Sequence, residues 1–170
     1  MALTPGTLID GARMYAAAAD AVNERYPNAL HVLSHLLGMS IELALKAFLL
    51  NGGREERDLR KIGHDLRALL EQAEAQGLTG TGSRHYRISV LGANYEDRIF
   101  AYPSEALLTI ILPSRLREIA QEVICEVFIS VKGKDIFDEF RAEPGLSIKS
   151  VYPDDLEPSH WAVPPKNPET

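Results

Sequence analysis

Apolar and polar positions alternate with helical spacing from the first residues of the chain. Thr4 is a suitable N-cap and Pro5 suits the first helical turn, so a helix is predicted from Pro5 to about Arg25, with Pro27 ending it. One face of this helix carries mostly small residues: Leu8, Ala12, Tyr15, Ala16 and Ala19. Such a face allows a neighbouring helix to approach closely.

A second helix is predicted from about Asn28 to Asn51, where Gly52 and Gly53 stop it. Between residues 36 and 50 this segment is nearly all apolar. A helix that is apolar on almost every side is buried by several neighbours. This segment is therefore expected at the centre of a bundle.

Three further helices are predicted downstream, at about 64–77, 84–97 and 113–131. The charged stretch 54–61, between the second predicted helix and the one that starts near residue 64, is expected to be exposed. Residues 106–112 are rich in Leu, Ile and Thr, and a short strand and an added helical turn remain open there. The fold class expected is an all-α, up-and-down bundle of four to five helices.

The chain divides by composition into a helical domain, 1–133, and a C-terminal extension, 134–170. The extension holds six of the ten prolines. Its residues 146–152 alternate like a short strand, so the appendage is expected to be extended and could contain β-structure. It could pack on the bundle or on a partner.

The charge balance narrows the classes of partner. The chain has 24 acidic and 18 basic residues, a net charge of −6 and a pI near 5.4. This balance argues against sequence-blind binding of duplex DNA, which needs a basic footprint. No signal peptide is recognisable in the first ten residues, and no uninterrupted apolar stretch approaches a bilayer span. A cytoplasmic protein without membrane contact is expected.

Cofactor and metal chemistry has little support in the sequence. The single Cys125 excludes an intrachain disulfide framework and a multi-cysteine zinc site. His31 and His35 could share a helix face, but neither a HExxH pattern nor a set of carboxylates accompanies them. No glycine-rich phosphate loop is present. Neither a metal nor a cofactor is expected.

Glu42 and Lys46 stand four residues apart on the buried second helix, in the order that favours an ion pair. His35 precedes Glu42 by seven residues and projects from about the same stripe. Two interpretations remain open. One is an internal salt bridge that satisfies two costly buried groups; the other is a polar pocket in which Lys46 holds a phosphate.

His64 and Asp65 occupy a predicted helix start. Asp65 could cap that helix while His64 reaches across to another one. Alternatively, His64 could act as an acid–base group, with Arg57 or Arg60 supplying positive charge for a phosphate. Both interpretations remain open.

Basic residues concentrate in the segments 54–67 and 84–98, with His85, Tyr86 and Tyr95 among them: Arg54, Arg57, Arg60, Lys61, Arg67, Arg84, Arg87 and Arg98. Arginines beside aromatic rings suit single-stranded RNA or nucleotide recognition. Interspersed acidic residues make a merely solvated charged face an equal alternative. Tyr95 and Arg98 could equally pack near the end of the bundle.

Three stretches together resemble HEPN domains (higher eukaryotes and prokaryotes nucleotide-binding domains). They are His35–Gly53, with the pattern E-x-A-x-K-A-x-L; Gly63–Leu70, with G-H-D-L-x-x-L-L; and Asn94–Pro103, with Y-x-x-R-x-x-x-Y-P. The resemblance covers roughly residues 10–131. It implies a bundle of four or five helices, commonly dimeric, found in prokaryotic defence, toxin–antitoxin and nucleotidyltransferase-partner systems.

The resemblance also implies a choice of function. Many HEPN proteins are metal-independent ribonucleases with an R-x(4–6)-H motif, to which Arg57 and His64 correspond; others bind nucleotides or RNA, or accompany a nucleotidyltransferase. His64 here also matches the helix start of a branch not generally credited with cleavage. We therefore expect a homodimeric nucleotide- or RNA-binding accessory module, with a nucleotidyltransferase or antitoxin as candidate partner. The alternatives are a ribonuclease and a purely structural interaction module. The expected ligand-binding residues are His35, Glu42, Lys46, Arg60, Asp65, Tyr95 and Arg98.

Overall fold

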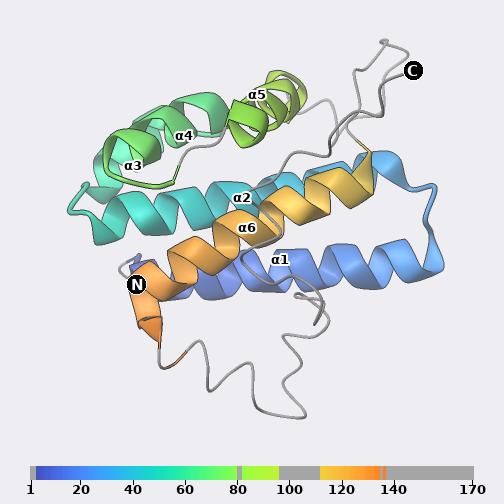
Figure 1. Ribbon diagram of the computed structural model, residues 1–170, viewed down its shortest axis with the longest axis horizontal. Helices are drawn as coiled ribbons and strands as arrows, with labels where there is room; N and C mark the ends of the chain where they lie inside the picture. Colours follow the sequence, from blue (N-terminus) through green and yellow to red (C-terminus); the bar gives the residue numbers. More distant parts are fainter. Residues whose placement is uncertain (1–2, 80–81, 96–111, 135, 137–170) are drawn as a thin grey trace, which may run out of the picture.

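The computed structural model describes residues 3–79, 82–95, 112–134 and 136 (Figure 1). These residues form six α-helices and no strand: α1 (Pro5–Arg25), α2 (Leu30–Asn51), α3 (Glu56–Ile62), α4 (Leu66–Ala75), α5 (Gly82–Tyr95) and α6 (Pro113–Lys132). The all-α class and the helical bundle predicted from the sequence are confirmed.

Helix α2 lies at the centre of the bundle. Helices α1 and α6 pack against one side of it, and α4 and α5 cover another (Figure 1). Its inward positions Ile41, Ala44 and Leu45 are completely buried. Helix α2 is long and apolar enough to cross a membrane, with a mean hydropathy of 1.5 over an 18-residue segment. However, 61% of that segment is buried inside the protein, and the core helices of soluble proteins are often as long and as apolar.

Helix α1 begins where the sequence predicts. The Thr4 side chain accepts a hydrogen bond from the Thr7 amide at 3.1 Å, and the Thr7 hydroxyl is 3.2 Å from the Thr4 amide, which completes a capping box. The small-residue face is buried against α2, where the Ser40 hydroxyl donates to the carbonyl oxygen of Ala12 at 2.9 Å.

Most of the charged stretch 54–61 belongs to an additional short helix, α3 (Glu56–Ile62). Its polar side chains stay at the surface while Leu59, 2% exposed, anchors it to the core. Gly63 then turns the chain with φ of +65°, a conformation that L side chains rarely adopt. This turn sets His64 and Asp65 immediately before α4.

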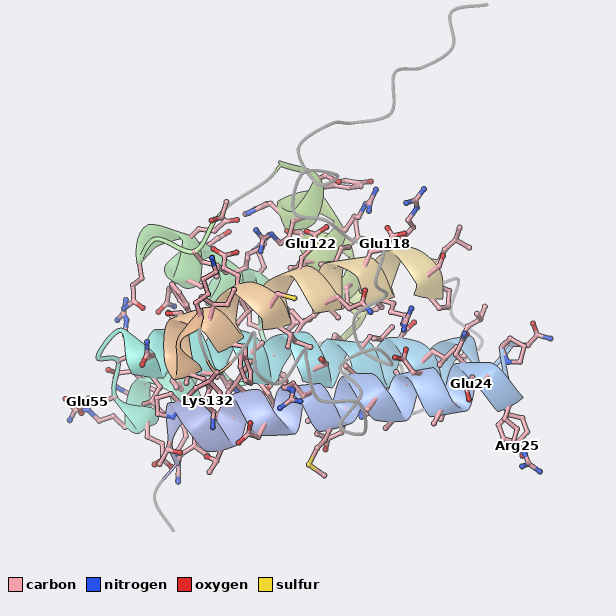
Figure 2. All side chains as sticks on the ribbon, turned by 60° about the horizontal axis from the view of Figure 1, so that its bottom comes forward. Glu24, Arg25, Glu55, Glu118, Glu122 and Lys132 are labelled. Atoms are coloured by element: carbon pink, nitrogen blue, oxygen red, sulfur yellow. The ribbon has the colours of Figure 1, made fainter. Side chains whose placement is uncertain are left out.

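Helix α6 returns along α1 and α2. Lys132, near its C-terminal end, forms an ion pair of 3.2 Å with Asp10 of α1, and Figure 2 shows Lys132 beside that helix. Glu118 and Glu122 project from a different side of α6 (Figure 2). Gly133 ends the helix with φ of +93°.

Several expectations fall on residues outside the described part of the chain. They concern residues 106–111, Arg98, and all of the extension 134–170 except Lys134 and Ile136. The strand-or-helix question and the extended appendage therefore stay predictions, as does the division at residue 133.

Candidate functional site

A buried carboxylate occupies the meeting point of α2, α4 and α5. The Glu42 side chain is only 3% exposed, yet it receives three side-chain hydrogen bonds. Lys46 Nζ lies 2.6 Å from Oε1, while His64 Nδ1 and Tyr95 Oη lie 3.0 and 2.9 Å from Oε2. We call Glu42, Lys46, His64 and Tyr95 the Glu42 cluster.

Local structure places each member of the cluster. Lys46 follows Glu42 by one helical turn, so the predicted i, i+4 ion pair forms. His64 stands in the turn before α4, and Tyr95 ends α5. The carboxylate thus ties two separate helices to the central one.

Hydrogen bonding keeps Glu42 ionised despite its burial. Burial by itself raises the pKa of this carboxyl, but the hydrogen bonds from His64, Lys46 and Tyr95 and the Lys46 charge outweigh it, and the pKa lies below its ordinary value. Tyr95 responds in the opposite sense: burial, followed by the nearby Glu42 charge, raises the pKa of its hydroxyl. Tyr95 therefore donates to an ionised Glu42 at neutral pH.

His64 is the member of the cluster that meets solvent. Its side chain is 43% exposed, in contrast to 14% for Lys46. An ionised carboxylate can only accept, so the hydrogen bond to Glu42 places a proton on Nδ1. The other ring nitrogen, Nε2, is then the one left to meet a ligand. A carboxylate that fixes an imidazole in this way suits it to bind a phosphate oxygen or to exchange a proton.

His35 and Met39 extend the cluster along α2. The His35 ring lies 5.9 Å from the Tyr95 ring, centroid to centroid, and Met39 Sδ lies 2.7 Å from Tyr95 Oη. The expected stripe from His35 to Glu42 thus exists, although His35 meets Tyr95 rather than the carboxylate. Sequence reasoning missed Met39 because a methionine on an apolar helix carries no distinctive signal.

Three other predicted site residues have local partners. Arg57 is exposed and pairs with Glu55 at 2.7 Å, and Arg60 pairs with Glu56. Asp65 caps α4, accepting a hydrogen bond from the Ala68 amide at 2.9 Å. The capping interpretation of Asp65 is therefore confirmed, whereas the approach of Arg57 to His64 stays a prediction.

The expected basic surface needs one correction. Arg84 is only 5% exposed and pairs with Glu126 of α6 at 3.1 Å, so it braces α5 against α6 and is not part of a solvent-facing patch. The surface arginines and lysine that remain on α3 and α4 are Arg57, Arg60, Lys61 and Arg67. All of them lie within ten residues of His64 in the sequence.

Metal chemistry has no candidate within the described ranges, where no group of three or more His, Cys, Asp or Glu side chains is arranged to hold an ion. The chain matches no protein-family model, no curated protein and no solved structure. Function is therefore inferred from the Glu42 cluster and its surroundings.

Proposed function

We propose that this protein is a HEPN-like accessory module that binds nucleotides or single-stranded RNA through the surface around His64. In this proposal the protein acts as a homodimer, in association with a nucleotidyltransferase or an antitoxin. The observation that carries the proposal is the hydrogen bond between buried Glu42 and half-exposed His64. It presents one imidazole in a fixed orientation at the surface.

Exposed basic side chains on α3, the helix that precedes His64 in the sequence, support a phosphate ligand. Arg57, Arg60 and Lys61 on α3 are 72 to 78% exposed. Their acidic partners Glu55, Glu56 and Asp58 are exposed to at least 35%, and exposed ion pairs of this kind contribute only about 0–1 kcal/mol. A phosphate can therefore replace the carboxylates at little cost. Lys46 lies beneath the surface, where its charge is balanced by the ionised Glu42.

A pair of histidine variants tests the proposal. His64→Ala removes the proposed contact, and His85→Ala is its matched control, because His85 also pairs with a glutamate (Glu74, 3.2 Å) and is 39% exposed, but on α5. Thermal unfolding is followed with nucleotides and a short single-stranded RNA at low and moderate salt. A ligand at 100 times its Kd stabilises the wild type by about 2.7 kcal/mol.

We expect the ligand-dependent shift in wild type and His85→Ala, weakened by salt, and its loss in a folded His64→Ala. Retention of the full shift in His64→Ala would remove this surface as the site. A shift insensitive to salt would exclude the basic residues as phosphate contacts, because released counterions make such binding salt-dependent.

A second candidate function is metal-independent RNA cleavage. It is favoured by the same Glu42–His64 hydrogen bond, which orients the imidazole for proton transfer. The 2′-hydroxyl would give its proton to His64 and attack the adjacent phosphorus. The bond to the 5′-oxygen would break, that oxygen would take a proton from the protonated His64, and Arg57 would stabilise the charge on the phosphate. We expect the wild type to cleave RNA in the presence of EDTA, and Arg57→Ala and His64→Ala to lose this activity. If the wild type leaves the RNA intact, cleavage is excluded and binding remains as the proposed function.

A further inference from the structure

The four helices that pack on α2 leave one stripe of it partly open to solvent. All but one of its positions are apolar: Val32, Leu36, Met39, Leu43, Lys46 and Leu50. Val32 is 49% exposed and the others are half-buried. Their spacing alternates between four and three residues, which is the a/d repeat by which helices pack on one another in coiled coils. The stripe therefore has the pattern of a surface that receives a further helix.

The stripe lies between the two groups of helices that flank α2. At about 100° per residue, Ser40 and Glu42 stand about 80° to either side of Val32 around the helix axis. Ser40 donates to the Ala12 carbonyl of α1, whereas Glu42 binds His64 and Tyr95. Helix α1 thus borders the stripe on one side, and the Glu42 cluster borders it on the other.

Helix α1 continues this surface with the same repeat. Its positions Gly11, Tyr15, Ala18 and Val22 also alternate by four and three residues; Ala18 is exposed and the other three are half-buried. Gly11 lies against the α2 stripe, because a β-carbon there would stand 3.3 Å from Leu43 Cδ1. We call the two stripes together the α1–α2 face.

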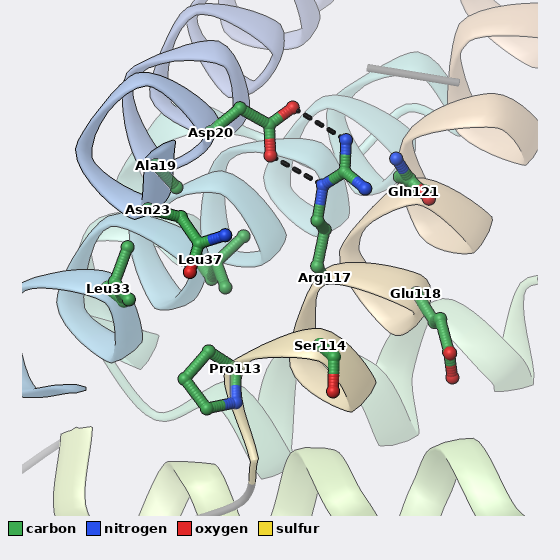
Figure 3. Close-up of a pocket in the computed structure, with 10 residues that line it drawn as sticks. All are labelled: Ala19, Asp20, Asn23, Leu33, Leu37, Pro113, Ser114, Arg117, Glu118 and Gln121. Atoms are coloured by element: carbon green, nitrogen blue, oxygen red, sulfur yellow. Dashed lines mark hydrogen bonds and ion pairs between the residues drawn. The ribbon is translucent and has the colours of Figure 1, made fainter. Parts of the chain in front are cut away.

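A different side of α1 and α2 is already closed by α6. There Arg117 donates to both oxygens of Asp20, at 2.5 Å from Nε and 2.9 Å from Nη2 (Figure 3). A pocket of about 370 Å³ remains beside this ion pair, and Leu33 and Leu37, which line it, are at most 2% exposed. These two leucines belong to the core, in contrast to the half-buried leucines of the α1–α2 face.

The α1–α2 face is apolar enough to need a cover. Only 61% of the most apolar segment of α2 is buried within the single chain. Lys46 is the only charged residue of the face, and it is paired with Glu42 at 2.6 Å. Such a face offers little to a phosphate, and the net charge of −6 disfavours an anionic membrane surface. The apolar face of another protein chain suits it best.

A second copy of this chain presents a matching stripe. The six positions of α2 are symmetric about residue 41, so a two-fold axis there places two α2 helices antiparallel with their stripes in contact. Each position then meets a counterpart in the other copy: Val32 meets Leu50, Leu36 meets Lys46, and Met39 meets Leu43. The aliphatic stem of Lys46 can cover a leucine while its ammonium group stays on Glu42.

The size of the α1–α2 face suits a weak, reversible dimer. Residues 32–50 of a helix span about 27 Å, and two adjacent helices are about 20 Å wide. The face therefore measures roughly 500 Å² per copy, or about 1,100 Å² in a dimer, which is near the lower limit for specific interfaces. We expect a dissociation constant in the micromolar range.

We propose that the α1–α2 face binds the same face of a second copy of this chain, with the two α2 helices antiparallel. The inference rests on the homodimer of the proposed function and assigns the surface that forms it. Because Lys46 belongs both to this face and to the Glu42 cluster, each ligand site borders the interface.

Charged substitutions at exposed positions of the face test the proposal. Val32→Glu and Ala18→Glu would each bury two carboxylates in an apolar interface. Ile129→Glu is the matched control, because Ile129 is also β-branched and is 39% exposed, but on α6. Sedimentation velocity of the full chain at micromolar concentrations gives the dissociation constant, and circular dichroism verifies that each variant is folded. The wild type is also sedimented with phosphatidylcholine vesicles.

We expect wild type and Ile129→Glu to dimerise with equal dissociation constants, and Val32→Glu and Ala18→Glu to raise that constant about tenfold or more. A monomeric wild type would overturn the proposal, and so would one that joins the vesicles as a monomer. Unchanged dimerisation of both face variants, or equal dissociation of Ile129→Glu, would overturn it as well.

The thermal-shift test on His64→Ala keeps the two proposals apart, because it reports ligand binding whatever the mass of the protein. A monomer that binds the ligand contradicts the interface and leaves ligand binding at His64 intact. A dimer that depends on Val32 and Ala18 but binds no nucleotide or RNA contradicts the ligand proposal alone.

Discussion

The ring of Tyr95 lies directly against the backbone of Gly38. A β-carbon at residue 38 would stand 2.6 Å from both Cδ2 and Cε2 of the ring, closer than real Cβ atoms approach other atoms. The absence of a side chain at this position lets the end of α5 come close enough to α2 for Tyr95 to donate to Glu42. The polar cluster thus depends on a glycine one helical turn before its carboxylate.

Gly38→Ala should therefore destabilise the protein, although alanine is the better helix former. The added methyl group displaces the Tyr95 ring and weakens its hydrogen bond to Glu42; overpacking of this kind costs about 1–3 kcal/mol. Urea unfolding measures the loss. Gly92→Ala is the matched control, because a β-carbon at this helical glycine would meet Leu66 Cβ at an ordinary 3.5 Å. It should be neutral or stabilise the fold by up to about 1 kcal/mol.

Lys46→Met should cost on the order of 3 kcal/mol, since it leaves the buried Glu42 charge without its cationic partner. The double variant Glu42→Gln/Lys46→Met should lose less than the sum of the two single losses, because it leaves no uncompensated charge. Denaturant unfolding of the three variants checks both statements. Additive losses would show that the two side chains are not coupled. Unchanged nucleotide or RNA binding in folded Lys46→Met would exclude Lys46 from the ligand site.

The lowered pKa of Glu42 predicts a dependence of stability on pH. The unfolded chain binds the proton near the ordinary pKa of 4.5, and the native protein binds it only at lower pH. The stabilisation is therefore fully present above about pH 4.5 and is lost as the pH falls through the native pKa. Wild type should exceed Glu42→Gln in stability at pH 7, and this difference should shrink below pH 4.5. A difference that stays constant from pH 7 to pH 3 would contradict the assignment.

Asp65 offers a test that separates capping from ligand binding. Asparagine caps helices about as well as aspartate, so Asp65→Asn should remain close to wild type in stability, whereas Asp65→Ala should lose about 1 kcal/mol. Thermal unfolding gives both values. If Asp65→Asn folds normally but no longer binds a ligand that the wild type binds, Asp65 has a direct role in the site as well.

Much of the fold could be predicted from local sequence. Thr4 and Pro5 fix the start of α1, Asp65 caps α4, and the apolar run of α2 identifies the central helix, because capping and helical periodicity act over only a few residues. The Glu42–Lys46 ion pair follows from the same short-range rule. Helix α3 was not predicted, since one buried leucine among charged residues is too weak a pattern.

What the sequence alone determined is the helical class, the central helix and the presence of ionisable residues on it. Which of them meet depends on how the helices pack: His64 and Tyr95 contact Glu42 from 22 and 53 residues away in the sequence, and Arg117 pairs with Asp20 from 97 residues away. The tertiary structure also showed that Arg84 is buried and pairs with Glu126 of α6. The reason is physical. Helix capping and periodicity depend on near neighbours, whereas burial, pKa and the pairing of distant charges depend on how whole helices pack.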